Sequence, residues 1–400
     1  MASLDNDLFH QLLKKWKHIP SLEIPQSYIH VADRLLYADE ELVRKVINIL
    51  VENITAWAIK NSKVYENRTS FIEKKELLNK DSWFVKEFPF NTQKMSTSGS
   101  TTGVPFQYLR WDDLLRRIEG DNHYDLVLNE FNIPEKPEIM SFFSHANEIY
   151  VSNDSANFMD HHGFSRQSNT HYIGMKELCR KNQEAFYNKV IEHILEHKLD
   201  VLFLAGPQTN SLCYYLKKNK INAKLATLLS NTNEKLLASD ARFLLQNKFV
   251  DYICDHMRCW DGGATFFTCK HYTYHLCDNL SYCTEIDKKL ISTDYFSFPS
   301  PFVNYWNGDY CEIGDTYKRC ECGRLYREFK FLENRPFAVK GVVISEVKKK
   351  IEEIGIKTIK QVKCTVYSIE IVSVEPIHQA QQKQIQDSFN IQFKFSVEPK

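Results

Sequence analysis

Residues 96–105 read Ser-Thr-Ser-Gly-Ser-Thr-Thr-Gly-Val-Pro and lead into 106–109, which we expect to be a strand. All but the last two are Ser, Thr or Gly, and these eight residues have no side chain that can pack into a core. Its hydroxyls and backbone N–H groups can donate hydrogen bonds to the oxygens of a polyphosphate. We interpret the stretch as a phosphate-binding loop; an ordinary polar surface turn is the alternative. The binding residues would be Ser98, Gly99, Ser100, Thr101, Thr102 and Gly103.

The loop is not a kinase-type P-loop, which has four residues between its glycines and a Lys after the second. Three residues separate Gly99 from Gly103, and Val104 follows. The stretch resembles instead the TSGTTGxP phosphate loop of the adenylate-forming superfamily, the acyl-CoA synthetases and their relatives, with one extra residue between the glycines. The resemblance implies ATP as the nucleotide and Mg²⁺ as its metal.

The composition points to recognition in a pocket. The chain has 400 residues, and its 51 Lys and Arg balance its 51 Asp and Glu, so no overall field directs it to nucleic acid or to a membrane surface. We find no run of eighteen apolar residues and no signal-peptide pattern at the N-terminus. These features predict a soluble cytoplasmic protein that binds neither nucleic acid nor membrane.

Helical and apolar segments alternate through the middle of the chain. Helices are expected at 39–62, 70–80, 182–197, 210–218 and 234–246, and strands at 138–143, 201–206, 224–229 and 250–254. Strands that are continuous apolar runs between helices favour parallel pairing with both faces covered. The predicted fold class is α/β: a large domain (1–334) of mostly parallel sheets covered by helices with a β-rich part from 269 to 325, and a small α+β C-terminal cap (335–400).

Within the superfamily, the motifs most resemble the phenylacetate-CoA ligase and CapK-type capsule-biosynthesis branch, over roughly residues 70–345. Asn231 and Thr232 lie where relatives line the adenine, and a helix N-cap is the other interpretation of this segment. Relatives then hold Mg²⁺ with the Glu of an aromatic-Gly-x-Thr-Glu segment. The resemblance assigns this catalytic role to Asp261 in one register; in the other, Phe266 stands in place of the acid.

Two further positions are implied by the same resemblance. The segment 304–309 resembles Tyr-x-Thr-Gly-Asp, which makes Asp309 the carboxylate that accepts hydrogen bonds from the ribose; an Asn-Gly-Asp hairpin turn is the alternative. Arg335 matches the catalytic arginine at the start of the C-terminal hinge, although the acidic hinge pair is absent. Lys394 and Lys400 are weak candidates for the catalytic lysine.

Four residues have the spacing of a structural zinc site. Cys269 and His275 are five residues apart, and Cys320 and Cys322 follow in a Cys-x-Cys-Gly turn. Three thiolates and an imidazole make a closed tetrahedral Zn²⁺ shell with no open water position. The same pieces recur in the phenylacetate-CoA ligase branch; four reduced residues in a β-rich core are the alternative.

The leading interpretation is an AMP-forming ligase that activates a carboxylic acid as an acyl-adenylate with release of pyrophosphate. The activated acid would then pass to a thiol or amine acceptor, such as CoA, an amino compound or a carrier. A nucleotide-binding degenerate homologue without ligase activity is the rival, and a zinc-dependent hydrolase is a more distant one.

Overall fold

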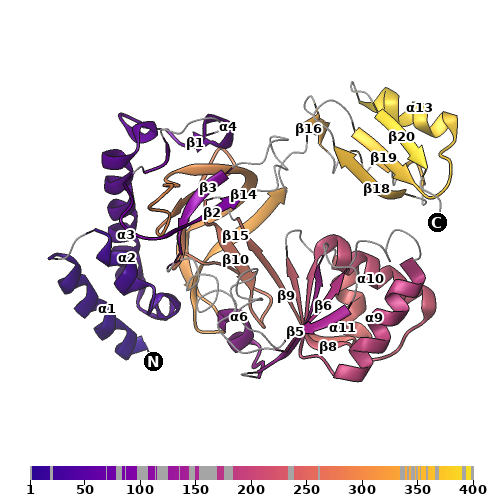
Figure 1. Ribbon diagram of the computed structural model, residues 1–400, viewed down its shortest axis with the longest axis horizontal. Helices are drawn as coiled ribbons and strands as arrows, with labels where there is room; N and C mark the ends of the chain where they lie inside the picture. Colours follow the sequence, from indigo (N-terminus) through magenta and orange to yellow (C-terminus); the bar gives the residue numbers. More distant parts are fainter. Residues whose placement is uncertain are drawn as a thin grey trace.

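The computed structural model describes the N-terminal helices, two large sheets and a smaller C-terminal part (Figure 1). The residues it describes are 2–18, 21–68, 70–77, 83–85, 87–96, 107–112, 114, 125–134, 136–143, 149–152, 169–174, 183–232, 238–259, 262–333, 338–339, 342–343, 347, 350–351, 353–356, 359–364, 369–389 and 393–397. Among these, no helix combines the length and the apolar character needed to cross a lipid bilayer.

The N-terminal region is helical. Its elements are α1 (Ala2–Trp16), α2 (Glu23–Tyr28), the 3-10 turns η1 (Ala32–Tyr37) and η2 (Lys63–Tyr65), and α3 (Glu40–Asn61), which confirms the helix predicted over 39–62. Helix α3 buries a stripe with helical periodicity: Leu42, Val43, Val46, Ile47, Leu50, Ile54 and Ala58. The helices are joined to the rest of the protein by buried bonds such as that from the Tyr28 hydroxyl to the carbonyl oxygen of Asn279 (2.8 Å).

The larger sheet has eight strands in the order β11-β10-β9-β8-β7-β4-β6-β5. They are β4 (Glu138–Phe143), β5 (Ile149–Ser152), β6 (Asn169–Gly174), β7 (Val201–Ala205), β8 (Ala226–Thr232), β9 (Val250–Arg258), β10 (Thr265–Thr268) and β11 (Tyr274–Leu276). Strands β6, β4, β7, β8 and β9 are parallel. The apolar runs predicted β4, β7, β8 and β9, whereas β6, which is largely polar, was not predicted as a strand. The outer strands at each end run antiparallel.

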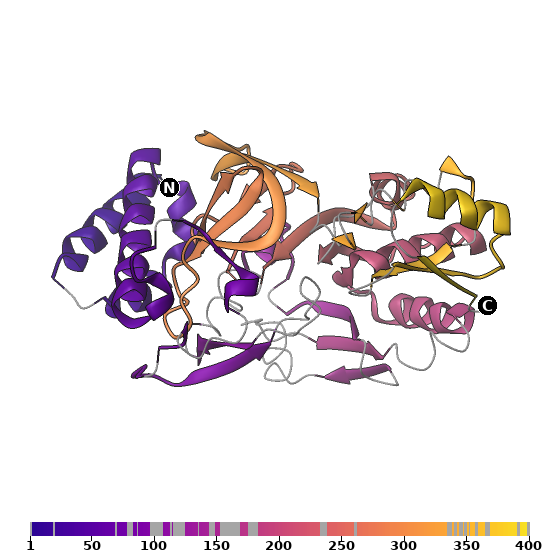
Figure 2. The same cartoon turned by 90° about the horizontal axis from the view of Figure 1, so that it is seen from above.

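Helices α9 (Gln183–His197), α10 (Gly206–Asn219) and α11 (Ala238–Gln246) accompany this sheet. Side chains alternate across each strand, so Leu202 and Leu204 pack with these helices while Val201 and Phe203 join the core shared with the N-terminal helices. Figures 1 and 2 show the three helices on the side of the sheet away from the N-terminal region.

The second sheet confirms the β-rich part. Its strands are β1 (Ile72–Glu73), β12 (Ser281–Ile286), β13 (Lys289–Asp294), β14 (Tyr305–Arg319) and β15 (Leu325–Glu333). The helix predicted over 70–80 is wrong in its first part, because Ile72 and Glu73 pair in parallel with β14 and only the single turn α4 (Lys74–Leu77) follows. Ile72 is fully buried by this pairing, which outweighs its local helical pattern.

A separate two-stranded hairpin carries the candidate phosphate loop. Strands β2 (Thr92–Ser96) and β3 (Gln107–Trp111) are antiparallel, and β3 is the strand expected after the loop.

The C-terminal part is α+β, as predicted. It contains the short pair β16 (Ala338–Val339) and β17 (Val342–Val343), and a sheet of β18 (Ile359–Cys364), β19 (Ile369–Ser373) and β20 (Phe393–Val397) with helix α13 (Gln379–Ser388). Helix α13 was not predicted, since it buries only Ile385 and its remaining residues are polar except for Ala380.

Candidate nucleotide site and cysteine–histidine cluster

The candidate phosphate loop begins and ends at the same point of the hairpin. Ser96 pairs with Gln107, the last pair of the β2–β3 ladder. The loop residues Ser98, Gly99, Ser100, Thr101, Thr102 and Gly103 lie outside the described residues, as do Asp261 and Arg335. The structure therefore locates the loop through its two ends.

Strand β3 is fixed to the second sheet by a buried ion pair. The Arg110 guanidinium donates to the Asp294 carboxylate at the end of β13, and both side chains are only 4% exposed. The neighbouring Leu109 N–H donates to Ser300 Oγ (2.8 Å). The exit of the candidate phosphate loop is thus anchored on two sides.

The same Asp294 lies close to Gly263, in the turn between β9 and β10. This turn joins β9 to β10 and is closed by hydrogen bonds between Cys259 and Ala264 (2.7 Å) and between Gly263 and Cys259 (3.0 Å). Gly263 has a φ of +73°, and a Cβ there would lie 2.5 Å from Asp294 Oδ2. Only glycine permits this close approach.

The alternative acid position, Phe266, is occupied by a core residue. Phe266 lies in β10, is 1% exposed and packs on Phe329 with ring centroids 4.9 Å apart. In that register the site would have no carboxylate.

Asp309 lies in a bulge of β14. Lys289 of β13 pairs with Tyr310 and Ile291 pairs with Trp306, so residues 307–309 occupy the space opposite the single residue 290. Gly308 supplies the required positive φ of +105°. The Asn-Gly-Asp sequence is therefore an irregularity within a long strand, and the hairpin-turn alternative is wrong.

Asn307 holds the Asp309 carboxylate in place. Its Nδ2 donates to Asp309 Oδ2 (2.8 Å), and its Oδ1 accepts from the Asp309 N–H (2.9 Å). The Cys259 thiol also lies 3.5 Å from Asp309 Oδ2. Because Cys259 begins the β9–β10 turn, this contact brings the start of that turn beside the Asp309 bulge.

Asn231 is placed at the carboxyl end of β8 but is buried. Its Oδ1 accepts from Thr209 of α10 (3.2 Å) and its Nδ2 donates to Asp255 of β9 (2.8 Å). Only 1% of the residue is exposed. Thr232 is the last residue of the same strand. The carboxyl ends of parallel strands are where ligands of such sheets bind.

The four predicted cluster residues come together from two hairpin turns. Cys269 follows β10 and His275 lies in β11, while Cys320 and Cys322 lie in the turn from β14 to β15. Their ligand atoms all lie within 4.8 Å of one another. The Cys269 and Cys320 sulfurs are 3.7 Å apart, and Cys322 Sγ is 3.5 Å from His275 Nε2.

The cluster polarises its own thiols. Hydrogen bonding from Cys322, and then from His275, lowers the pKa of the Cys269 thiol to about 3, against the effect of burial. The pKa of Cys322 is raised because it donates to Cys269 and is itself removed from water. A thiolate is the form that ligates a metal.

A buried ion pair braces the cluster. Arg324 donates to Glu130 of α6 (Asp125–Glu130) at 2.6 Å, with both side chains about as buried as those of Arg110 and Asp294. The Glu130 carboxylate also accepts from the backbone N–H of Lys270 (3.4 Å). The ion pair thereby links both ligand turns to the same helix.

Sequence reasoning missed the partners of these groups. Arg110 and Asp294 are distant in the chain and match no motif, so no local signal joins them. The contact between Asn307 and Asp309 could have been predicted, because residues two positions apart on a regular strand face the same side.

Comparison with known protein families found no matching family, and comparison with curated proteins found no match either. Solved structures do match. A 2-hydroxyisobutyryl-CoA ligase in the postadenylation state, in complex with R3-HIB-AMP, superposes with a TM-score of 0.61 at 11% identity, covering 91% of this chain and 87% of that one. This chain has a CoA-ligase fold.

The same ligase also matches in other states. In complex with 2-HIB-AMP and CoA in the thioesterification state it gives a TM-score of 0.61 at 11% identity, over 91% of this chain and 88% of the other. An open conformation with 2-HIB-AMP and CoA gives 0.58 at 10% identity, over 89% and 88%. At these identities the likeness to the CoA ligase is one of fold.

Proposed function

We propose that this protein is an AMP-forming ligase that activates a carboxylic acid with ATP and transfers the acyl group to a thiol or amine acceptor. The observation that carries the proposal is the convergence of three separate motifs. Strand β3 leaving the candidate phosphate loop, the β9–β10 turn and the bulge containing Asp309 are joined through Arg110, Asp294 and Cys259. In the sequence, Asp261 falls between the two ends of that turn. The CoA-ligase fold supports the same conclusion.

Each motif has a part in binding ATP. The hydroxyls and N–H groups of 98–103 would bind the phosphates, the Asp309 carboxylate would accept from the ribose hydroxyls, and Asn231 and Thr232 would lie near the adenine. Arg335 would stabilise charge on the phosphates. Mg²⁺, when bound, would neutralise phosphate charge, with Asp261 as an oxygen ligand.

The chemistry has two steps. A carboxylate oxygen of the acid attacks the α-phosphorus of ATP. The bond from that phosphorus to the oxygen that bridges the α- and β-phosphates breaks, which releases pyrophosphate. The thiol or amine then attacks the acyl carbon. AMP leaves with the oxygen that joined the acyl carbon to its phosphorus, and the proton of the acceptor is lost to solvent. Positioning and charge stabilisation are the protein's main contributions to phosphorus chemistry.

The cysteine–histidine cluster suits a structural zinc ion. A tetrahedral shell with metal–sulfur bonds of about 2.3 Å and metal–nitrogen bonds of about 2.0–2.1 Å separates two sulfurs by roughly 3.8 Å and a sulfur from a nitrogen by roughly 3.6 Å. The observed 3.7 Å and 3.5 Å agree with these values. The cluster supports the phenylacetate-CoA ligase and CapK-type branch.

We also propose that residues 335–400 form a separate small domain, and that the enzyme is cytoplasmic.

The proposal is tested by measuring pyrophosphate release from ATP and Mg²⁺ with a panel of carboxylic acids and hydroxylamine as the acceptor. We expect acid-dependent release, and a loss of roughly 10–100-fold in kcat/KM for ATP in Asp309→Asn, because hydrogen bonds to a charged group contribute about 1.5–3 kcal/mol. Asp315→Asn, an exposed position in the same strand, is the matched control and should retain activity.

Two outcomes would contradict the proposal. Acid-dependent release that is equal in wild type and Asp309→Asn would remove Asp309 from the nucleotide site. ATP binding without release for any acid would favour a nucleotide-binding homologue without ligase activity.

A further inference from the structure

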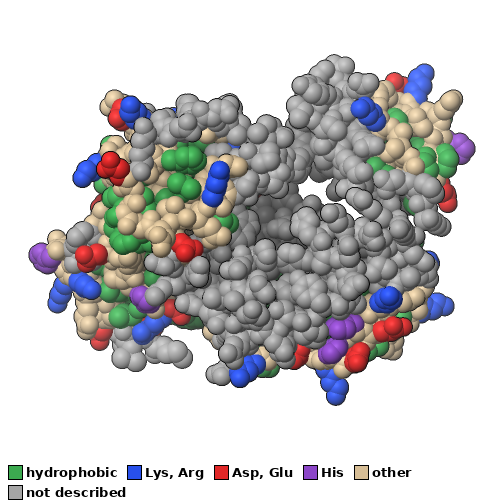
Figure 3. All heavy atoms as spheres, in the orientation of Figure 1, with side chains coloured by type: hydrophobic (Ala, Val, Ile, Leu, Met, Phe, Trp, Pro, Cys, Tyr) green, Lys and Arg blue, Asp and Glu red, His purple; other side chains and the backbone are tan. Residues whose placement is uncertain are grey.

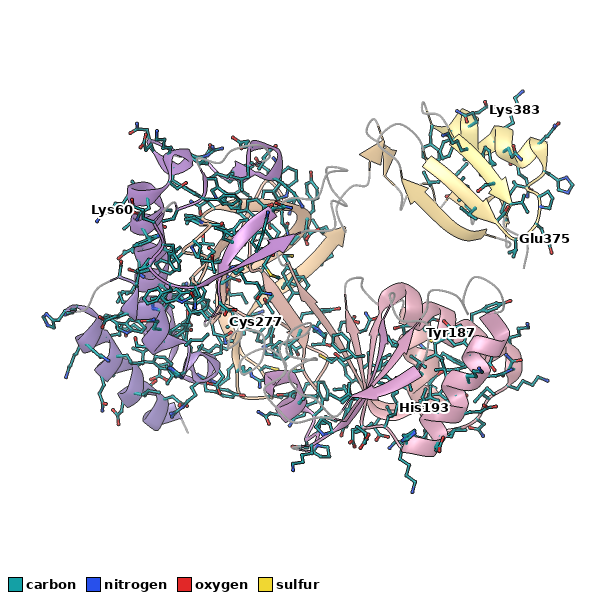
Figure 4. All side chains as sticks on the ribbon, in the orientation of Figure 1. Lys60, Tyr187, His193, Cys277, Glu375 and Lys383 are labelled. Carbon is teal, nitrogen blue, oxygen red and sulfur yellow. The ribbon has the colours of Figure 1, made fainter. Side chains whose placement is uncertain are left out.

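The outer surface of α9 carries a second group of metal-ligating side chains. His193, Glu196 and His197 offer ligand atoms that all lie within 4.8 Å of one another. The two imidazole rings have centroids 4.2 Å apart. Figure 4 labels His193 on this helix, and Figure 3 shows histidine side chains at the surface of the same part of the molecule.

The geometry follows from helical periodicity. Residues three and four positions apart are neighbours on one face of a helix. Glu196 and His197 therefore both lie one turn away from His193 on the same face. Helix α9 is held in this orientation because Val190, Ile191 and Ile194 are buried against the sheet. The two histidines are partly exposed and Glu196 is exposed, so solutes can reach all three.

The position on the helix also favours a cation. His197 is the last residue of α9, where the C-terminal end of the helix dipole carries partial negative charge. Lys189 and Lys198 are nearby positive charges that oppose binding, whereas Glu192 and Glu196 are negative. Imidazole nitrogens select Zn²⁺, Ni²⁺ and Cu²⁺ over Mg²⁺ and Ca²⁺.

We propose that helix α9 binds a divalent transition-metal cation through one imidazole nitrogen each of His193 and His197 and a carboxylate oxygen of Glu196. Water completes the coordination, because three donors on one helix face leave the solvent side open. The order His-x-x-Glu-His also occurs in a class of zinc peptidases. Here the glutamate is a metal ligand at an exposed surface, and the site is a binding site.

This site is distinct from the cysteine–histidine cluster. The cluster has two buried thiols and the half-buried thiol of Cys322 on the β10–β11 and β14–β15 turns, whereas the α9 group has no sulfur and faces solvent. The two sites therefore differ in accessibility and in the residues whose substitution abolishes them.

The test uses the untagged 400-residue chain. Weakly bound metal is first removed by gel filtration, and the tightly bound metal that remains is measured. Calorimetric titration with NiCl₂ should show one additional equivalent bound. His193→Gln and His197→Gln should each weaken that binding at least about tenfold, since even an outer-shell partner of a metal site is worth roughly 10–100-fold in affinity. Glutamine preserves helix propensity, which keeps α9 intact.

His10→Gln is the matched control, because His10 is a single exposed histidine on helix α1. It should leave the affinity for Ni²⁺ unchanged. As a second readout, Ni²⁺ should raise the Tm of the wild type and of His10→Gln but not that of the double variant His193→Gln/His197→Gln. No additional equivalent in the wild type, or equal binding by wild type and the double variant, would overturn the proposal.

Discussion

Arg110 and Asp294 form a buried ion pair that connects strand β3, at the exit of the candidate phosphate loop, with the end of β13. Asp294 also accepts a hydrogen bond from the Phe296 N–H (2.9 Å), and its carboxylate lies close to the Gly263 backbone. One carboxylate thus fixes the relative positions of two motifs that are about 150 residues apart in the sequence.

Asp294→Asn should destabilise the protein strongly. The substitution keeps the side chain's shape but removes the negative charge that neutralises the buried Arg110 guanidinium, which costs about 3–5 kcal/mol in free energy of unfolding. Urea denaturation measures the effect. Asp251→Asn is the control, because its ion pair with Lys224 is exposed and should contribute at most about 1 kcal/mol. Equal losses in the two variants would show that the buried pair is not a structural anchor.

Gly263→Ala should cost more than its backbone conformation alone explains. Gly355 has a similar φ of +76° with nothing within 4 Å of an added Cβ, so Gly355→Ala reports only the backbone strain, on the order of 1–2 kcal/mol. Gly263→Ala adds the collision with Asp294. Urea unfolding midpoints of the two variants give the difference, and similar midpoints would contradict the close approach.

Asn307→Ala should impair ATP use through Asp309. The variant loses the amide that orients the carboxylate, so we expect kcat/KM for ATP to fall roughly 5–10-fold, equivalent to about 1–1.5 kcal/mol, mainly through KM. Asn53→Ala removes a side-chain amide bond to the Ser21 carbonyl oxygen far from the bulge and serves as the control. An unchanged KM in Asn307→Ala, with Asp309→Asn impaired, would show that Asp309 needs no positioning by Asn307.

Elemental analysis should find one zinc ion per chain at the cysteine–histidine cluster. Cys269→Ser should lose it and unfold at a lower temperature, because metal binding contributes directly to the stability of a folded site. Cys213→Ser, at a buried thiol of α10 outside the cluster, should retain the zinc. Zinc at full occupancy in Cys269→Ser would exclude this residue as a ligand.

Stability should decline at alkaline pH because buried thiols resist ionisation. Burial raises the pKa of Cys213 to about 12, and Cys311 is raised to about 12 in the same way. Above the unfolded-state pKa of about 8.5, the native state holds protons that the unfolded state has released, so each unit of pH removes about 1.4 kcal/mol per thiol. Urea midpoints between pH 7.5 and 10 measure this slope, and Cys213→Ala should flatten it. An identical slope in the variant would contradict the assignment.

The sequence predicted elements whose pattern is local. The parallel strands β4, β7, β8 and β9 are short apolar runs, and helical periodicity marks the segments between β7, β8 and β9. The apolar runs and the helical segments together identified these strands. Helix α13 was not predicted because a polar helix that buries one isoleucine has almost no hydrophobic periodicity. Strand β1 was missed because its pairing with β14 depends on residues more than 200 positions away.

The candidate site divides along the same line. The cysteine–histidine set could be predicted because metal ligands of that type have recognisable spacing. The burial of Asn231 between α10 and β9, and the bulge at Asp309, depend on tertiary packing that no motif encodes. The roles of Asp261, Arg335 and the loop residues remain predictions to be tested by substitution.

The β2–β3 hairpin bears on how such proteins diverge. Because Ser96 pairs with Gln107, residues can be gained or lost between them without changing the register of either strand, and the cost of closing a slightly longer loop is small. The stretch here has one residue more between its glycines than the TSGTTGxP pattern. Evolution can therefore adjust the length and donor pattern of this segment while the two strands that flank it keep their pairing.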